Sequence, residues 1–568
     1  MSLAAVLLLS LQDPAELARR IDTLIPWITD GVELEDGSKD FPKAPEVDRL
    51  ALLERAKREA RERNLPVLWY CMRVPGTHTY RAAVLDRYAR VALFTDPGLA
   101  AFIRDRFVPL RMACDERVSA ATGIRFPTFI EPGFVVLDAD GRVVRAIDRI
   151  RTFDADRIRA RLGDEASAGG ARGKDDAPEA LYRRSAAEWW SGKDPEATWR
   201  RLIEEHPESP WAWRAAANLV RGRDGLREGP MAHHFEGYPG PAGGGPEERA
   251  LEFLLRAQRE DGSWSDARYS YGWASYMIRR KKAEGTLDPA YVSWPDTSHH
   301  PNVFMAVTAL AALALLERRE AAPARIDAAL ERAERYLRDE ANLAPDRCEE
   351  CYAQAYRLLY FAARKDAPRM NRIVRRLAEI QDADGFWGHE YPSAFATAAV
   401  VRCLVLARKA GAEVPEPLFR RAAEALLRTR NEDGRQDYRH EPGKPRSSEK
   451  DSMGRTASSE LALLECGRGA LENVAAGLEA YWRHRDRLEA VRLCDNHADG
   501  ELAGFFYFNS VFHTLEAARA LPEPAAHLER FRRQALAAQE PDGSFLDSHE
   551  LGKSYGTAMA LLVLRRTK

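Results

Sequence analysis

A short turn recurs in the second half of the chain and limits what this half can fold into. The stretch "AQREDGSW" (257–264) returns in part as "IQDADGFW" (380–387), "TRNEDGRQ" (429–436) and "AQEPDGSF" (538–545). Glycine accepts a positive φ, and an aspartate side chain bonds the backbone ahead of it, so Asp-Gly is typical of tight turns. Each copy separates a charged amphipathic stretch from an alanine-rich one. The pattern therefore predicts turns that join pairs of helices.

The alanine-rich stretches repeat often enough to predict an architecture. Each is preceded by a charged partner such as "ERAERYLRD", and the partner would cover it from the solvent side. Because one pair cannot bury its apolar face alone, repeated pairs are expected to pack together into a closed double ring, an all-α (α/α)6 toroid spanning residues 248–568. The six apolar stretches are 300–319, 351–364, 391–409, 454–467, 507–521 and 554–566.

Within the turn, the glutamine is expected to cap the preceding helix, and the aromatic residue is expected to fasten neighbouring pairs together. The Gln-x-x-Asp-Gly-x-Trp pattern resembles the repeat of squalene–hopene cyclases and related terpenoid cyclases. More broadly, residues 248–568 resemble the toroid of protein prenyltransferase β-subunits. The cyclases protonate an alkene with an Asp-x-Asp-Asp motif, which this region lacks. The repeat therefore predicts the fold and leaves the chemistry open.

The first half of the chain has a different pattern. The run "LPVLWYCM" predicts a strand, "DPGLAAFIRDRF" (96–107) a helix, "VPLRM" a second strand and "GFVVLDADGRVVRAI" a hairpin around an Asp-Gly turn. Residues 46–162 resemble a thioredoxin-like α/β sandwich, with Pro132 at the family's cis-proline position. The redox cysteine pair should follow the first strand, but "RVPGTHTYR" stands there. We therefore expect no thiol–disulfide exchange from Cys71 or Cys114, and a binding or docking role instead.

The whole chain is thus predicted to be a multidomain protein. A polar linker at 163–180 separates the sandwich from a tetratricopeptide-like helical hairpin at 181–222. A Gly- and Pro-rich linker at 223–247 then leads to the toroid.

The N-terminal segment and the overall charge bear on location and partners. Residues 1–12 include an apolar run with the length of a signal-peptide core, but without a basic start. We expect export, to the periplasm for example; the alternative is a cytoplasmic protein in which this run begins a helix. The run is too short to span a bilayer, so no integral membrane protein is expected. A net charge of −2 argues against a nucleic-acid partner.

Candidate catalytic residues come from the predicted starts of the apolar helices, where side chains from different pairs converge. Imidazoles titrate near neutral pH and can move protons or bind a metal, and a carboxylate or thiolate can complete either kind of site. Polar residues at helix starts also serve as caps, which is the competing interpretation. The candidates are His299, Glu349, Cys351, His389 and His513.

A metal site is a second hypothesis for the same end of the toroid. Cys348 and Cys351 have the spacing of half a zinc site, and Cys494 and His497 would supply the other half. A disulfide between Cys348 and Cys351 and a pair of inert thiols remain as alternatives. The resemblance to prenyltransferases implies another zinc set, with Glu349 and Cys351 in place of an Asp-x-Cys pair and His389 as a third ligand.

Two functions from different classes follow. The first is a non-redox binding or scaffold protein whose toroid holds an apolar or extended small molecule or a protein ligand. The second is a toroid enzyme, either a metal-assisted transferase or hydrolase or an atypical isoprenoid-processing enzyme. The cofactor is not identified by the sequence; zinc is the one it suggests.

Overall fold

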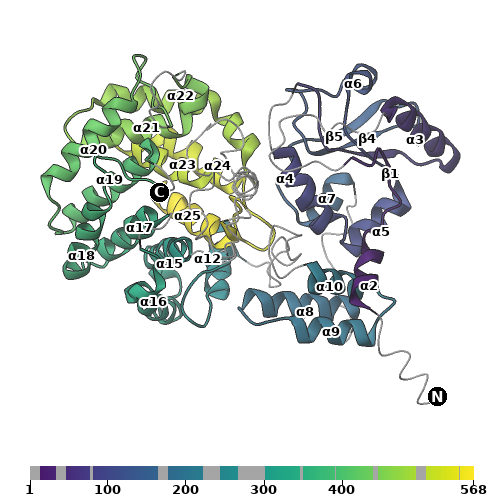
Figure 1. Ribbon diagram of the computed structural model, residues 1–568, viewed down its shortest axis with the longest axis horizontal. Coiled ribbons are helices and arrows are strands. Elements are labelled where there is room, and N and C mark those ends of the chain that lie inside the picture. The colour runs from purple at the N-terminus through teal and green to yellow at the C-terminus, as the bar shows by residue number, and fades with distance from the viewer. Residues whose placement is uncertain are drawn as a thin grey trace, which may run out of the picture. The chain divides into compact units, whose positions relative to one another are not determined.

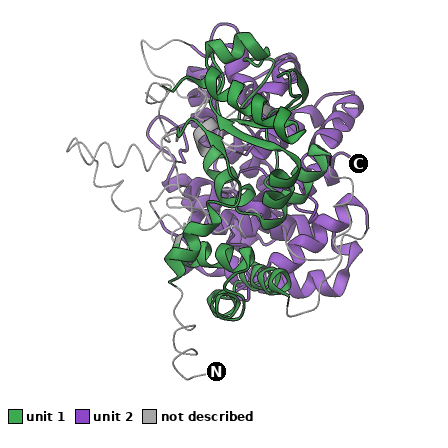
Figure 2. Ribbon diagram, turned by 90° about the vertical axis from the view of Figure 1, so that its right-hand side faces the viewer, with its two compact units in different colours: residues 1–241, 270–297 green, residues 242–269, 298–568 purple. Residues whose placement is uncertain are grey.

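The computed structural model describes residues 13–32, 47–76, 81–163, 177–221, 244–266, 301–345, 349–389, 392–438, 446–493, 507–548 and 551–568. The segment 1–12 and most of the two linkers lie outside these residues. The chain divides into two compact units, shown in different colours in Figure 2. Unit 1 comprises residues 1–241 and 270–297, and unit 2 comprises residues 242–269 and 298–568.

Unit 1 contains a mixed five-stranded sheet in the order β1-β3-β2-β4-β5 (Figure 1). β3 pairs in parallel with β1 and β2, whereas β4 runs antiparallel to both β2 and β5. The predicted strands and the hairpin are confirmed, and the sheet also takes in β1, which precedes residue 46. The strands are β1 (Ile28–Thr29), β2 (Val67–Cys71), β3 (Val108–Met112), β4 (Gly133–Leu137) and β5 (Val143–Ile147).

Successive residues of a strand point to opposite faces of the sheet. Helices cover the apolar side chains that the strands present on these faces. Trp69 of β2 shares a buried core with Leu53 and Ala56 of one helix and Val118 of another. The peptide bond between Glu131 and Pro132 is cis. The helices around the sheet are α3 (Arg49–Arg63), α4 (Arg81–Tyr88), α5 (Pro97–Arg106), α6 (Glu116–Thr122) and α7 (Ala155–Leu162).

The region predicted as a helical hairpin in unit 1 contains three helices, and a fourth helix near the N-terminus packs on them. α8 (Pro178–Trp190), α9 (Glu196–Glu205) and α10 (Pro210–Arg221) share a core with α2 (Pro14–Ile21). The predicted pair of helices could not bury its aromatic faces alone, and a third helix together with α2 supplies the missing surface. Buried Arg214 of α10 donates to the Asp96 carboxylate at 2.8 Å and to the Ala92 carbonyl oxygen at 3.0 Å. These bonds attach the helical layer to the start of α5.

The described part of unit 2 is built from pairs of helices (Figure 1). In each pair one helix is almost wholly buried, and we call it the inner helix. The inner helices are α15 (Pro301–Leu316), α17 (Glu350–Ala363), α19 (Ala394–Lys409), α21 (Glu449–Glu465), α23 (Tyr507–Arg519) and α25 (Gly552–Arg566). The outer helices are α12 (Pro246–Ala257), α16 (Pro323–Arg338), α18 (Ala367–Glu379), α20 (Glu416–Thr429), α22 (Leu471–Val491) and α24 (Ala525–Leu536).

The inner helices contact one another in a closed order. Each inner helix packs on the next one in the chain, and α25 packs on α15. Small residues allow this close approach on every side, so residues all around each inner helix are buried, as at Ala309, Ala396 and Ala558. The outer helices instead bury one face, as expected for amphipathic segments.

The glutamine of the repeated turn joins neighbouring pairs. Gln381 Nε2 donates to the Gly385 carbonyl oxygen of its own turn at 3.0 Å and to the Leu418 carbonyl oxygen of the following outer helix at 3.2 Å. Gln258 does the same toward α16. Gln539 donates to the Pro246 carbonyl oxygen of α12 at 2.7 Å and so links the last pair to the first. The expectation that this residue caps its own preceding helix was wrong.

The tryptophan of the turn acts within its own pair. Trp387 is fully buried, and its Nε1 donates to the Leu377 carbonyl oxygen of α18 at 2.8 Å. Its backbone N–H donates to Thr397 Oγ1 of α19 at 3.0 Å. Trp264 makes the corresponding bonds between α12 and α15. These hydrogen bonds tie an outer helix to its own inner helix, whereas the sequence had suggested a link between neighbouring pairs.

The turn at 429–436 replaces the aromatic residue with a polar group. Gln436 stands at the tryptophan position, and its Nε2 donates to Glu460 Oε1 of α21 at 3.1 Å. Arg430, at the glutamine position, donates to the same carboxylate at 2.8 Å. Burial raises the pKa of Glu460, and its arginine and glutamine neighbours partly offset this effect. A buried polar cluster thus performs the bridging role at this turn.

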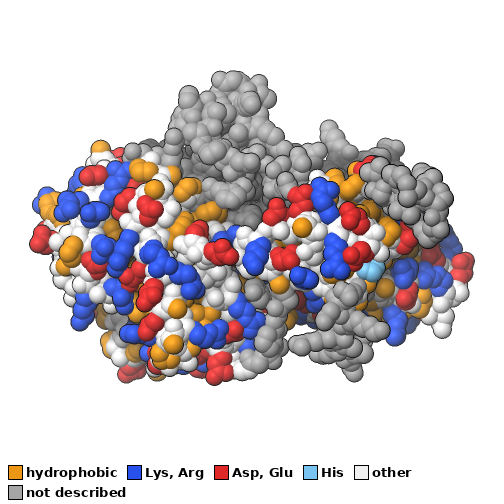
Figure 3. All heavy atoms as spheres, turned by 90° about the horizontal axis from the view of Figure 1, so that it is seen from below, with side chains coloured by type: hydrophobic (Ala, Val, Ile, Leu, Met, Phe, Trp, Pro, Cys, Tyr) orange, Lys and Arg blue, Asp and Glu red, His pale blue; other side chains and the backbone are white. Residues whose placement is uncertain are grey.

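The charge distribution on the surface and the hydropathy of the helices agree with the composition of the sequence. On the face in Figure 3, basic and acidic side chains of the described residues are mixed, without a broad area of one sign. No helix in the described ranges is long and apolar enough to cross a membrane.

Candidate functional site

The clearest convergence of predicted site residues is at the start of α17. Glu349 precedes this helix, and His389 lies in the turn before α19. His389 Nδ1 lies 3.3 Å from Glu349 Oε1, and its Nε2 lies 3.4 Å from the Tyr438 hydroxyl. The imidazole therefore bridges a carboxylate and a phenol, and all three side chains are buried.

The backbone holds Glu349 in an uncommon conformation. Its φ is 64°, in the left-handed region that residues other than glycine seldom occupy. Its N–H donates to the His389 carbonyl oxygen at 2.9 Å. The two residues are therefore joined through both backbone and side chain, which fixes the direction of the carboxylate.

Glu349 also lines a small cavity between the inner helices. The cavity has a volume of about 30 Å³, enough for one water molecule or the end group of a ligand. This volume is much smaller than that of the usual small-molecule pocket. The surface exposed to the cavity is almost wholly apolar, although the lining residues include tyrosines, an asparagine and a glutamate. The lining residues are Val303, Ala306, Val307, Glu349, Tyr352, Tyr356, Asn509, Leu551 and Tyr555.

The phenols of this cavity are hydrogen-bonding groups and stay protonated. Burial raises the pKa of Tyr352, Tyr356 and Tyr555 well above the ordinary value. Tyr356 donates its hydroxyl hydrogen to Asn509 Oδ1 at 3.0 Å. Near neutral pH these three phenols are therefore neutral.

His513 lies apart from Glu349 and His389. It is within α23, more than a turn beyond Asn509, and its charged neighbours are Glu516, Arg402 and Arg566. Burial lowers the pKa of His513 to about 4, so the ring is neutral at pH 7. Its Nε2 has no hydrogen-bond partner within the described residues.

The metal hypothesis rests mostly on residues that the structure does not describe. Cys351 is buried in the first turn of α17. Within the described residues, no three His, Cys, Asp or Glu side chains form a group suited to a metal ion. The remaining candidates of both hypotheses, His299, Cys348, Cys494 and His497, lie outside the described residues.

The tyrosines were not singled out by sequence reasoning. Tyr352 and Tyr356 are four residues apart and stack at a centroid distance of 5.7 Å, as expected for one face of a helix. That spacing was a usable signal. Tyr438 was harder to find, because it follows a turn and reaches His389 from another helical pair. Asp547 was also missed; it accepts hydrogen bonds from the Tyr507 and Phe508 amides at the start of α23.

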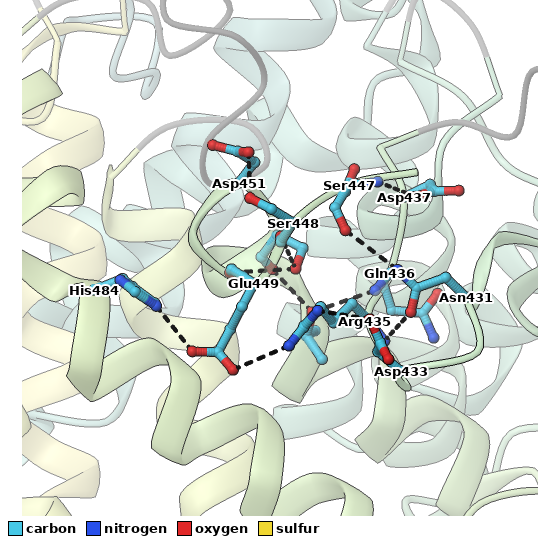
Figure 4. A network of polar contacts seen from close by, with 12 residues as sticks. Asn431, Asp433, Arg435, Gln436, Asp437, Ser447, Ser448, Glu449, Asp451 and His484 are labelled. Atoms are coloured by element: carbon cyan, nitrogen blue, oxygen red, sulfur yellow. Dashed lines mark hydrogen bonds and ion pairs between the residues drawn. The ribbon is translucent and has the colours of Figure 1, made fainter. Parts of the chain in front are cut away.

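The polar residues at the start of α21 have a structural role (Figure 4). Glu449 pairs with His484 at 2.8 Å and with Arg435 at 3.5 Å. Asp451 accepts from the Ser448 hydroxyl. Arg455 donates to the Gln436 carbonyl oxygen at 2.8 Å and thereby braces the preceding turn. These contacts brace α21 against α22 and the preceding turn, whereas the N-cap residue Ser448 makes no side-chain capping hydrogen bond.

The thiols of unit 1 are placed poorly for exchange chemistry. Cys71 and Cys114 are fully buried free cysteines. Burial raises the pKa of Cys71 well above the usual value, and it raises that of Cys114 to about 12. Because the thiolate is the nucleophile, both side chains should be inert at neutral pH.

We therefore expect neither thiol to react in the folded protein. Iodoacetamide at pH 7.5, followed by mass spectrometry, should leave Cys71 and Cys114 unmodified until denaturant is added. The native protein should also fail to reduce insulin. Labelling of either residue within minutes in the native state, or insulin reduction lost in Cys71→Ser, would contradict this.

Comparison with known proteins adds little. No protein-family model matches the sequence, and no curated protein matches it. Two similar solved structures are of the type II terpene cyclase MstE from Scytonema, one without ligand and one a variant in complex with merosterolic acid A. Both are 16% identical and give a TM-score of 0.35 over 56% of this chain, covering 96% and 95% of the cyclase chains. Similarity this low assigns no function.

Proposed function

We propose that the chain is a non-redox binding protein in which unit 2 is an (α/α)6 toroid that holds a ligand at the Glu349 cavity. The observation that carries the proposal is the carboxyl group of Glu349, held by His389 beside a small, largely apolar cavity whose lining also includes three tyrosines. The cavity matches the end of an apolar molecule that bears a hydrogen-bond donor, such as a long-chain alcohol. The rest of such a ligand would lie outside the 30 Å³ cavity.

Two features support this proposal. The inner helices contact one another in a closed order, which is the arrangement that a toroid requires. In unit 1, the mixed sheet with its C-terminal hairpin supports the proposal of a thioredoxin-like module, and its buried thiols favour docking over catalysis.

The test is displacement of the neutral apolar dye Nile red by 1-decanol, with decane as the matched ligand without a donor. We expect the alcohol to displace the dye at lower concentration than the alkane does. Because glutamine replaces one carboxyl oxygen with an NH2 group that cannot accept a hydrogen bond, Glu349→Gln should weaken alcohol binding about tenfold. It should leave alkane binding unchanged.

A second variant distinguishes loss of binding from loss of folding. Val307→Phe fills the cavity from α15 and should abolish the difference between alcohol and alkane while circular dichroism stays that of the wild type. Equal displacement by both compounds in the wild-type protein, or an alcohol affinity indifferent to both substitutions, would refute the site.

The second candidate function is a toroid enzyme, either a metal-assisted transferase or hydrolase or an isoprenoid-processing enzyme. The Tyr438–His389–Glu349 chain favours it, because an imidazole between a phenol and a carboxylate can relay a proton. Incubation with geranylgeranyl diphosphate, with and without zinc, tests this candidate. Product formation that is lost in both Glu349→Gln and His389→Ala would favour the enzyme over the binding protein.

A further inference from the structure

A second, larger depression in unit 2 lies at the opposite ends of the inner helices. Its volume is about 690 Å³, within the usual range for small-molecule sites. Its walls come from the final turns of α19, α21, α23 and α25 and from Glu317, just after α15. Six basic side chains and three carboxylates line it, so its described lining has an excess of three positive charges.

The carboxylates are already engaged in the floor of the depression. Glu516, 2% exposed, accepts from Arg402 at 2.7 Å, from Arg566 at 3.0 Å and from Arg519 at 3.1 Å. Burial alone would raise the pKa of Glu516, but the guanidinium groups of Arg566 and Arg402 outweigh it and lower that pKa to about 2. Glu465 pairs with Arg402, and Glu317 with Arg566. The floor is therefore ion-paired at neutral pH.

Three cations remain toward the solvent side. Lys409 is exposed, and its charge partly offsets the rise that burial causes in the pKa of Glu465 in the floor. Arg565 and Lys568 pair with Glu320 at 3.2 Å and Glu247 at 3.0 Å, respectively, and neither of these carboxylates lines the depression. Burial, followed by repulsion from Arg318, Arg532 and Arg565, lowers the pKa of Lys568. Two of these three cations, Arg565 and Lys568, thus pair with carboxylates outside the lining.

Compensation of the helix ends does not account for this arrangement. Basic residues in a last turn offset the partial negative charge of a helix C-terminus, but that effect falls off within the turn itself. Compensation of the helix ends does not require a depression large enough for a ligand. Both Arg408 and Lys409 lie in the last turn of α19, but Arg408 pairs with Glu416 at 3.1 Å and only Lys409 lines the depression.

We propose that this depression is a binding site for a small polyanion of the diphosphate type, held by Lys409, Arg565 and Lys568 above the ion-paired floor. The site is separate from the Glu349 cavity and is independent of the function proposed there. A phosphate group accepts several charge-assisted hydrogen bonds, and arginine can contact it with two at once. The ion-paired floor would keep Arg402 and Arg566 rigid beneath the ligand.

Isothermal titration calorimetry of the full chain with pyrophosphate tests the proposal. We expect saturable one-to-one binding that weakens as salt is raised, because the contacts are ionic. The double substitution Lys409→Ala with Lys568→Ala should weaken it at least about tenfold. Lys450→Ala removes the same kind of exposed cation from the start of α21 and should leave the affinity unchanged.

Sulfate at equal ionic strength controls for a general salt effect, and circular dichroism checks that each variant is folded. No saturable heat with pyrophosphate, or equal weakening by Lys450→Ala and by the double substitution, would overturn the proposal. Binding of 1-decanol at the Glu349 cavity should persist in the double variant, so failure at one site can be told from failure at the other.

Discussion

Replacing Trp387 with alanine is expected to lower the free energy of unfolding of unit 2 by about 3–5 kcal/mol, the usual range for a buried aromatic side chain. The indole is 0% exposed, and it is hydrogen-bonded to both helices of its pair. Truncation leaves a cavity and an unpaired Leu377 carbonyl group at once. Urea unfolding followed by far-ultraviolet circular dichroism measures the loss.

Trp387→Phe is the matched control, because it keeps an aromatic ring and removes only the Nε1–H donor. We expect it to cost clearly less than Trp387→Ala, since position 545 carries phenylalanine at the equivalent turn. Equal stability of wild type and Trp387→Ala would show that the indole does not hold the helical pair together.

Replacing Gly385 with alanine should also be severe, through the contact with the next pair. Gly385 has a φ of 89°, and an added Cβ would lie 2.3 Å from the Arg421 carbonyl oxygen of α20. Gly411 has a φ of 103° but nothing within 4 Å of an added Cβ. Both alanine variants pay the cost of left-handed backbone, and only the first also forces two helices apart.

We therefore expect Gly385→Ala to destabilise unit 2 by about 1–3 kcal/mol more than Gly411→Ala, the usual cost of overpacking. The two variants are compared by the same urea unfolding measurement. Equal losses would mean that the turn tolerates displacement of its neighbour, and the close approach at Gly385 would then have no role in assembly.

The turns themselves could be predicted from the sequence, but their contacts with neighbouring helical pairs could not. Asp-Gly signals a positive φ through local chemistry alone, and the structure has it at Gly262, Gly385, Gly434 and Gly543. The partner of Gln381 could not be predicted in the same way. Its second acceptor, Leu418, is 37 residues away, and only the packing of one pair on the next brings it near.

The candidate site was likewise predictable only in part. Glu349 and His389 were selected because both precede inner helices, and neighbouring helix starts meet in space. His513 was selected by the same rule, but it lies inside α23, where it faces the charged cluster of Glu516 rather than the Glu349 cavity. Cavity size could not be predicted, because it depends on how far Tyr352, Tyr356 and Tyr555 fill the space between the inner helices.

Hydrogen–deuterium exchange with and without 1-decanol tests the central claim most directly, because it locates the ligand without assuming a reaction. The account predicts slower exchange at the start of α17, around Glu349 to Tyr356, and at the start of α25, around Leu551 to Tyr555, where the cavity lining lies. Unit 1 should be unchanged and serves as the internal reference. The same protection should be absent in Glu349→Gln at the same alcohol concentration. Protection confined to unit 1, or protection of α17 that is undiminished in Glu349→Gln, would contradict the proposed site.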